Sequence, residues 1–252
     1  MKYEFKYHDF EELLSNLKAK KYNFVSFPEV RENLKAGNTF CLMRHDIDYD
    51  VHKALKIAEI EALEGVTSTF FFLLRTKKYN LLEKTSTEAI EKILSLGHKM
   101  GLHFDCAEYP PDMTLEETRV ACQQEVLIIE RWFQCKVDAV SFHRPLRAEK
   151  SEKIIALGDS FNIGVPHTYL PIYTREITYV SDSCGEWKYG HPTSLDAFKN
   201  SCPLHILIHP FWWNEQHYGA QEVFVRHLQN VTIDYDKNMA RESRIYKSID
   251  TA

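Results

Sequence analysis

Hydrophobic and polar positions follow two different periods along this chain. Short apolar runs, typical of buried strands, alternate with segments in which apolar residues recur every three or four positions, typical of amphipathic helices. The expected strands cover residues 39–45, 67–74, 99–104, 137–143, 161–165, 177–180 and 204–209. The helices expected between and after them cover residues 51–64, 87–96, 114–133, 149–157 and about 220–230.

One more helix is expected ahead of this series, where Asp9 precedes the apolar positions Phe10, Leu13, Leu14 and Leu17. Regular alternation of strands and helices predicts a parallel sheet with crossover helices, and about seven strands in one series favour a closed or nearly closed barrel. We find no linker, repeat or low-complexity stretch, so residues 1–252 are predicted to form a single domain. The polar tail after Asp234 is expected to be loosely packed.

Composition narrows the class of protein. The chain has 252 residues, of which 44% are hydrophobic, enough for a sizeable core. The net charge of −5 and the lack of a basic tract argue against a nucleic-acid partner. No apolar run approaches the ~18 residues of a membrane span, and the first residues lack the apolar segment of a signal peptide. Six scattered cysteines without a Cys-x-x-Cys pair suit reduced thiols. These features predict a cytoplasmic protein.

The segment that follows the first apolar strand carries two carboxylates, Asp46 and Asp48. Residues two apart on a strand point to the same side, and the carboxyl end of a strand faces the mouth of an α/β fold. Two neighbouring carboxylates are unfavourable unless a cation or a proton lies between them. A divalent metal beside a general base would satisfy both.

Polar residues also gather at the ends of other expected strands. They are His103, Asp105, His143, Arg144, Asp182 and His209. Because the carboxyl ends of parallel strands meet on one face of a barrel, these residues should surround one mouth together with the two aspartates. An Asp with two His is a common set of ligands for zinc, with positions left open for water. A remaining Asp and His would suit a general base and a general acid.

Five motifs, in order between about residues 39 and 213, resemble those of the polysaccharide deacetylases, the carbohydrate esterase type-four or NodB-homology superfamily. They are Arg44-His-Asp-Ile-Asp48, Gly97-His-Lys-Met-Gly-Leu-His103, Ser141-Phe-His-Arg-Pro145, Ser181-Asp-Ser-Cys-Gly-Glu-Trp187 and Leu207-Ile-His-Pro210. The resemblance implies a distorted (β/α) barrel with one divalent metal ion, zinc being the expected one. It also implies hydrolysis of an N-acetyl or related acyl group on an amino sugar or glycan precursor by metal-activated water.

The resemblance assigns the first roles residue by residue. Asp46 would be the catalytic base, and Asp48 and His103 metal ligands. The second histidine of the family's motif would fall at Ala107, which cannot bind a metal. We infer that His143 replaces it from another strand end. Asp105, two residues from His103 on the same side of the strand, is the alternative, and we favour His143 because imidazole is a common zinc ligand.

The remaining roles follow from the later motifs. Arg144 would position the catalytic base, and Asp182 would orient His209, the general acid. Trp187 and Trp212 would contribute to substrate binding. Two other interpretations use the same residues: a metal-dependent hydrolase of a non-sugar amide or imide, and a non-catalytic member that binds glycan.

Overall fold

A computed structural model describes residues 4–144 and 149–249 of the chain. In this part of the chain seven strands form one sheet, in the order β5-β4-β3-β2-β7-β6, with β1 also paired to β2. Every pair is parallel. The strands are β1 (Asn23–Val25), β2 (Phe40–Ile47), β3 (Thr69–Phe72), β4 (Lys99–Phe104), β5 (Val137–Phe142), β6 (Thr178–Ser181) and β7 (Leu204–Ile208).

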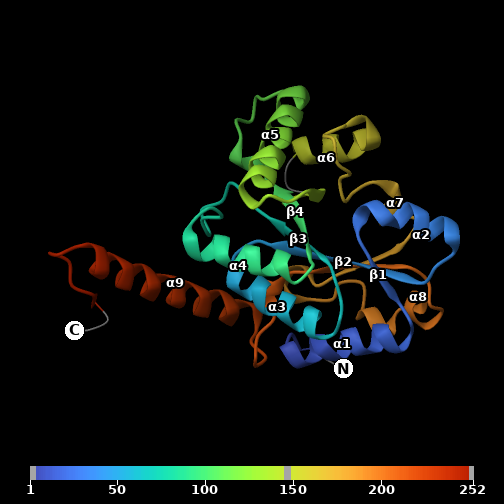
Figure 1. Cartoon of the computed structure of the whole chain (residues 1–252), viewed down its shortest axis with the longest axis horizontal. Coiled ribbons are helices and arrows are strands. Elements are labelled where there is room, and N and C mark those ends of the chain that lie inside the picture. The colour runs from blue at the N-terminus through green and yellow to red at the C-terminus, as the bar shows by residue number, and fades with distance from the viewer. Residues whose placement is uncertain (1–3, 145–148, 250–252) are drawn as a thin grey trace.

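Helices connect and surround the strands (Figure 1). They are α1 (Tyr7–Ala19), α2 (Val30–Ala36), α3 (Val51–Leu63), α4 (Lys84–Ser95), α5 (Leu115–Phe133), α6 (Glu149–Leu157), α7 (Pro171–Thr174), α8 (Asp196–Lys199) and α9 (Ala220–Glu242). Strands β5 and β6 stand at the two ends of the sheet order, and Val140 of β5 makes an isolated bridge to His167 in the segment before β6. The arrangement is the expected distorted (β/α) barrel.

Alternation along β2 divides the core into two layers. Phe40 and Leu42 pack in an inner cluster with Phe71 of β3. Cys41 and Met43 point the other way, into a larger cluster that includes the apolar faces of α1 and α3. Because side chains on a strand alternate between its faces, Arg44 and Asp46 continue the inner row. The functional side chains of this strand therefore point into the barrel.

Three details of the fold differ from the sequence prediction. Residues 161–165 do not form a strand, because Asn162 Oδ1 accepts a hydrogen bond from Gly164 N (2.9 Å) and Gly164 turns the chain with a φ of 88°. The short strand β1 and the helices α2, α7 and α8 are additional to the predicted elements. The last helix extends to Glu242 rather than ending near residue 230.

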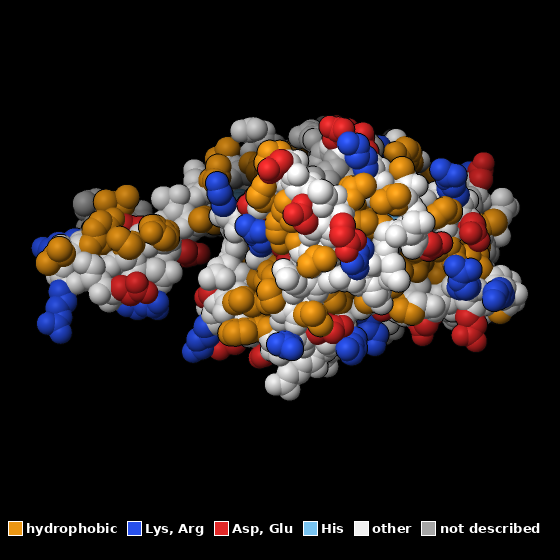
Figure 2. Space-filling model, turned by 90° about the horizontal axis from the view of Figure 1, so that it is seen from above, with side chains coloured by type: hydrophobic (Ala, Val, Ile, Leu, Met, Phe, Trp, Pro, Cys, Tyr) orange, Lys and Arg blue, Asp and Glu red, His pale blue; other side chains and the backbone are white. Residues whose placement is uncertain are grey.

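Helix α9 projects from the body of the molecule (Figure 1), and Figure 2 shows hydrophobic side chains along the projection. Leu228, Val231 and Tyr235 are 63, 45 and 68% exposed, whereas Val223 near the start of the helix is buried. The chain then turns back, and Tyr246 Oη donates a hydrogen bond to Asp236 Oδ1 (2.6 Å). No helix in the described ranges is both long and apolar enough to cross a membrane.

Close packing between β3 and β4 depends on a glycine. Gly101 lies beside Phe71 in the strand register, and a Cβ built on Gly101 would stand 2.4 Å from Phe71 Cδ1. Phe71 is fully buried, so its ring has no space to retreat. The inner layer therefore needs a residue without a side chain at this position.

We expect Gly101→Ala to lower the free energy of unfolding by about 1–3 kcal/mol, the usual range for overpacking in a core. Urea denaturation measures the change. In a Phe71→Leu background the same substitution should have a smaller effect, because the ring that it would strike is gone. Equal effects in both backgrounds would contradict the proposed contact.

Candidate active site

Three side chains converge at the carboxyl end of the sheet. Asp48 follows β2, His103 belongs to β4 and His143 follows β5. One ligand atom from each lies within 4.8 Å of the other two. Asp48 Oδ1 is 3.3 Å from His103 Nε2 and 3.6 Å from His143 Nε2. Ligands bound to a tetrahedral zinc ion at ~2.0–2.1 Å lie about 3.3 Å from one another, so these separations suit a shared ion.

Hydrogen bonds at Nδ1 fix the orientation of both imidazoles. His103 Nδ1 hydrogen-bonds to Ser141 Oγ (2.6 Å), and His143 Nδ1 donates to Asp105 Oδ2 (2.6 Å). Each ring therefore turns its Nε2 atom toward Asp48. Metal-binding histidines commonly have such a partner on the other nitrogen.

Asp48 supplies the observation that favours a cation. Its Oδ1 atom is buried and has no hydrogen-bond partner within the described parts of the chain. Burial alone would raise the pKa of Asp48, but the nearby His103, His209 and His143 outweigh this effect and lower it. An ionised, buried oxygen that faces two imidazole nitrogens fits a divalent metal ion.

Asp105, the alternative ligand, lies behind His143 rather than beside it. Besides the bond from His143, it accepts hydrogen bonds from Ala107 N (2.9 Å) and Arg144 Nη2 (3.2 Å). Burial raises the pKa of Asp105, but these donors, with His143 first among them, lower it below its ordinary value. We therefore keep His143 as the proposed third ligand, with Asp105 orienting its ring.

The guanidinium that holds Asp46 comes from Arg44, which is not among the predicted site residues. Arg44 Nε and Nη2 donate to the two oxygens of Asp46 (2.8 and 2.7 Å), and Nη1 donates to Thr168 Oγ1 (3.0 Å). Arg44 and Asp46 are two residues apart on one strand, and this spacing was a signal that could have identified the pair. Arg144, which was expected in this role, is half-exposed and pairs with Asp105 instead.

Asp46 is ionised beside the cluster. Burial raises its pKa, but Arg44, followed by His103, outweighs burial and lowers it. Asp46 Oδ2 lies 3.8 Å from His103 Nε2. Each carboxylate oxygen accepts one hydrogen bond from Arg44 and keeps a second lone pair for a proton.

His209, which follows β7, is bound by a fully buried Asp182. Its Nδ1 donates to Asp182 Oδ1 (2.7 Å), and its backbone N–H lies 2.9 and 3.0 Å from the two carboxylate oxygens. Trp213 Nε1 donates to Oδ2 (2.9 Å). Burial lowers the pKa of His209, but Asp182, with Asp48 and Asp46, raises it to about 9. The imidazole is therefore cationic at neutral pH, as expected for a general acid.

The two tryptophans expected to bind substrate are largely enclosed. Trp212 is only 8% exposed and packs on Phe224 of α9, with 5.5 Å between ring centroids. It has little surface left for a sugar, which contradicts its expected role. Trp187 is half-buried against Phe5, at a centroid distance of 6.1 Å. Its contact with substrate stays a prediction.

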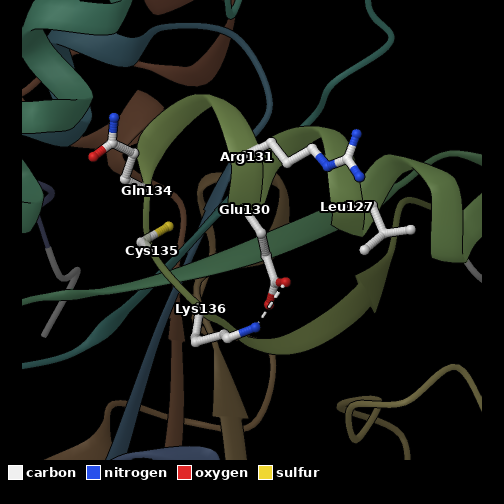
Figure 3. Close-up of a pocket in the computed structure, with 6 residues that line it drawn as sticks. All are labelled: Leu127, Glu130, Arg131, Gln134, Cys135 and Lys136. Carbon is white, nitrogen blue, oxygen red and sulfur yellow. Dashed lines mark hydrogen bonds and ion pairs between the residues drawn. The ribbon is translucent and has the colours of Figure 1, made fainter.

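Two other polar features lie away from this site. His45 points to the opposite face of β2, where its Nε2 is 2.8 Å from Glu61 Oε1 in a fully buried pair. A hollow lined by residues of α5 and the following turn is shown in Figure 3, with Glu130 and Lys136 paired at 3.2 Å. Because this hollow adjoins the amino end of β5, it lies at the other end of the strand from His143.

Comparisons with known proteins found similar solved structures only. No family model matches the chain, and no curated protein matches it. The chain is similar to a deacetylase, PplD, from Streptococcus pyogenes, with 11% identity, 80% of each chain covered and a TM-score of 0.48. It is also similar to a CE4 family pseudoenzyme from Bacillus anthracis, with 16% identity over 77% of this chain and 60% of that one, and a TM-score of 0.42.

A third similar structure is the chitin deacetylase of the fungal pathogen Colletotrichum lindemuthianum. It shares 13% identity over 75% of this chain and 81% of that one, with a TM-score of 0.41. At these identities and TM-scores the likeness assigns no activity to this chain.

We expect His143→Ala to remove most of the bound zinc from protein loaded with one equivalent, because the variant leaves only one imidazole beside Asp48. Asp105→Asn should weaken zinc binding by about 10–100-fold, the usual effect of losing the partner of a ligand. Elemental analysis and competition with a chelator measure both effects. His217→Ala, which removes an exposed histidine, is the control. Unchanged zinc affinity in His143→Ala would contradict the assignment.

In the metal-free protein we expect the imidazole of His209 to titrate at about pH 9, followed by NMR. Asp182→Asn should bring this pKa down. Because folding raises the pKa of His209, the pair stabilises the fold fully below the ordinary pKa of histidine, and this contribution is lost as pH rises through about 9. A pKa of His209 that is unchanged in Asp182→Asn would show that the aspartate does not hold the proton.

Proposed function

We propose that this protein is a metal-dependent hydrolase that removes an N-acetyl or related acyl group from an amino sugar or glycan precursor. The observation that carries the proposal is the pair of opposite charge states around the three-residue cluster. Asp46 is held as a carboxylate and His209 as an imidazolium, and Asp48, His103 and His143 lie beside them. A base and an acid kept apart in this way are what hydrolysis of an amide requires.

The proposed ion is zinc, held by Asp48, His103 and His143. One carboxylate and two imidazoles with open positions are typical of catalytic zinc sites. When bound, such an ion supplies Lewis acidity, which favours ionisation of water and polarises an acyl oxygen.

The chain's own residues would move the protons. Asp46 accepts the proton of the water that attacks the acyl carbon, and Arg44 keeps the carboxylate in place. His209 donates its Nε2 proton to the departing nitrogen, because its Nδ1 proton is engaged by Asp182. A C–O bond forms, the C–N bond breaks, and the products are a carboxylate, acetate in the simplest case, and a free amine.

The motif resemblance supplies the substrate class of this proposal. The choice of an amino sugar over another amide follows from the five motifs, since the described residues favour only the type of reaction. The cytoplasmic location stays a prediction. An assay that compares sugar and non-sugar amides separates the alternatives.

We expect zinc-loaded protein to release acetate from N-acetylglucosamine oligomers, and Asp46→Asn to retain zinc while losing about 10²–10⁴-fold in rate. The substitution keeps the shape of the side chain and removes the proton acceptor. Acetate release and zinc content are measured on the same samples, and Asp159→Asn at an exposed position is the control.

Three outcomes would count against the proposal. Loss of zinc in Asp46→Asn would make Asp46 a ligand instead of the base. Hydrolysis of acetanilide but not of the sugar would favour a non-sugar amidase. Glycan binding without hydrolysis of either substrate would identify a non-catalytic member.

A further inference from the structure

Two of the three proposed ligands lie just past the end of a strand. Asp48 follows Ile47, the last residue of β2. His143 follows Phe142, the last residue of β5. His103 differs, because it lies inside β4, a strand that is paired on both sides. Strand pairing therefore fixes the backbone of His103, whereas the backbones of Asp48 and His143 depend on further contacts.

The hydroxyl of Tyr79 holds the first of these strand ends. It donates a hydrogen bond to Ile47 O and accepts one from Leu73 N, both at 2.8 Å. Ile47 is paired with Phe72 in the last register position of β2 and β3, so Leu73 is the first residue beyond direct pairing. The hydroxyl therefore bridges the two chains at the point where they separate, one residue before Asp48.

The hydroxyl of Tyr169 holds the second strand end. It donates to Phe142 O at 3.1 Å, and the two rings are stacked with 5.8 Å between their centroids. The backbone N–H of His143, in the same peptide group as Phe142 O, donates to Phe104 O (2.9 Å). Because the N–H and C=O of a trans peptide point in opposite directions, this peptide group is held from both sides.

Both hydroxyls keep their protons at neutral pH. Burial raises the pKa of Tyr79 well above its ordinary value, and it also raises the pKa of Tyr169. Each hydroxyl therefore acts as a hydrogen-bond donor under the conditions in which a metal ion would bind. Asp48 in particular depends on its backbone, because its buried Oδ1 has no hydrogen-bond partner among the residues that the structure describes.

We propose that Tyr79 and Tyr169 are positioning residues for the metal site, each acting through the backbone of one ligand. Tyr79 sets the direction in which Asp48 leaves β2, and Tyr169 sets the direction in which His143 leaves β5. The proposal rests on the ligand set of the proposed function and extends it to two residues outside the five motifs. Removal of hydrogen bonds that orient metal ligands typically weakens metal binding by about 10–100-fold.

Zinc affinity, measured by competition with a chelator, tests the proposal in single variants. Tyr79→Phe and Tyr169→Phe each remove one hydroxyl and should weaken zinc binding about tenfold, at the lower end of the usual range because the ligands themselves stay intact. Tyr22→Phe is the matched control, since Tyr22 Oη donates to Cys202 O (2.8 Å) ahead of β7, at the end of the sheet away from the cluster. Its zinc affinity should equal that of the wild type. Urea denaturation of the metal-free proteins should show similar losses of stability in all three variants.

A second measurement links each tyrosine to its own ligand. In a His143→Ala background, Tyr169→Phe should leave the weak residual zinc affinity unchanged, because the imidazole that it positions is gone. Tyr79→Phe in the same background should still weaken binding, because Asp48 is still present. An equally large effect of Tyr169→Phe with and without His143 would overturn the proposal, since the tyrosine would then act on the fold as a whole. So would unchanged zinc affinity in both single variants.

Acetate release by the wild-type protein distinguishes this proposal from the proposed function. Zinc affinity that falls in both tyrosine variants, with no hydrolysis by the wild type, would support the positioning role and refute the deacetylase. Hydrolysis by the wild type, with zinc affinity unchanged in both variants, would support the deacetylase and refute the positioning role.

Discussion

Buried carboxylates at the carboxyl end of a parallel sheet have to be neutralised, and this constraint organises the mouth of the barrel. Asp46 has Arg44, Asp182 has His209 and Trp213, and Asp105 has His143 and Arg144. Asp48 is the exception, since its buried Oδ1 has no hydrogen-bond partner in the described segments. Because a buried charge without a partner is costly, the exception marks the place where a cation would bind.

The same pairings set the charge states on which the proposed chemistry depends. A guanidinium holds Asp46 ionised, and a buried carboxylate holds His209 protonated, although desolvation opposes both. The pKa of Asp46 is lowered and the pKa of His209 is raised within one site. The ion pairs that neutralise the buried carboxylates therefore also set the protonation states that the proposed chemistry needs.

Two roles in this site are assigned to residues that differ from those in the motif pattern that the chain resembles. In that pattern an arginine of the third motif holds the base, whereas here the guanidinium on Asp46 comes from β2 itself. We propose that His143 serves as the ligand that the second motif, with Ala107, does not offer. Arg144 is half-exposed and pairs with Asp105 instead. The arrangement keeps a guanidinium on Asp46 and a second imidazole beside Asp48.

The sequence by itself determined the parallel α/β architecture and the strand ends on which the polar residues lie. Both follow from local periodicity and from the rule that parallel strands end on one face. Tertiary structure alone decided that Arg144 pairs with Asp105, that Asp105 lies behind His143 and that Trp212 is buried under α9. These outcomes depend on which strands are neighbours and on the few ångströms between side chains far apart in sequence. The local pattern also gave a wrong prediction of a strand at residues 161–165. There a hydrogen bond from Gly164 N to the side chain of Asn162 competes with strand pairing.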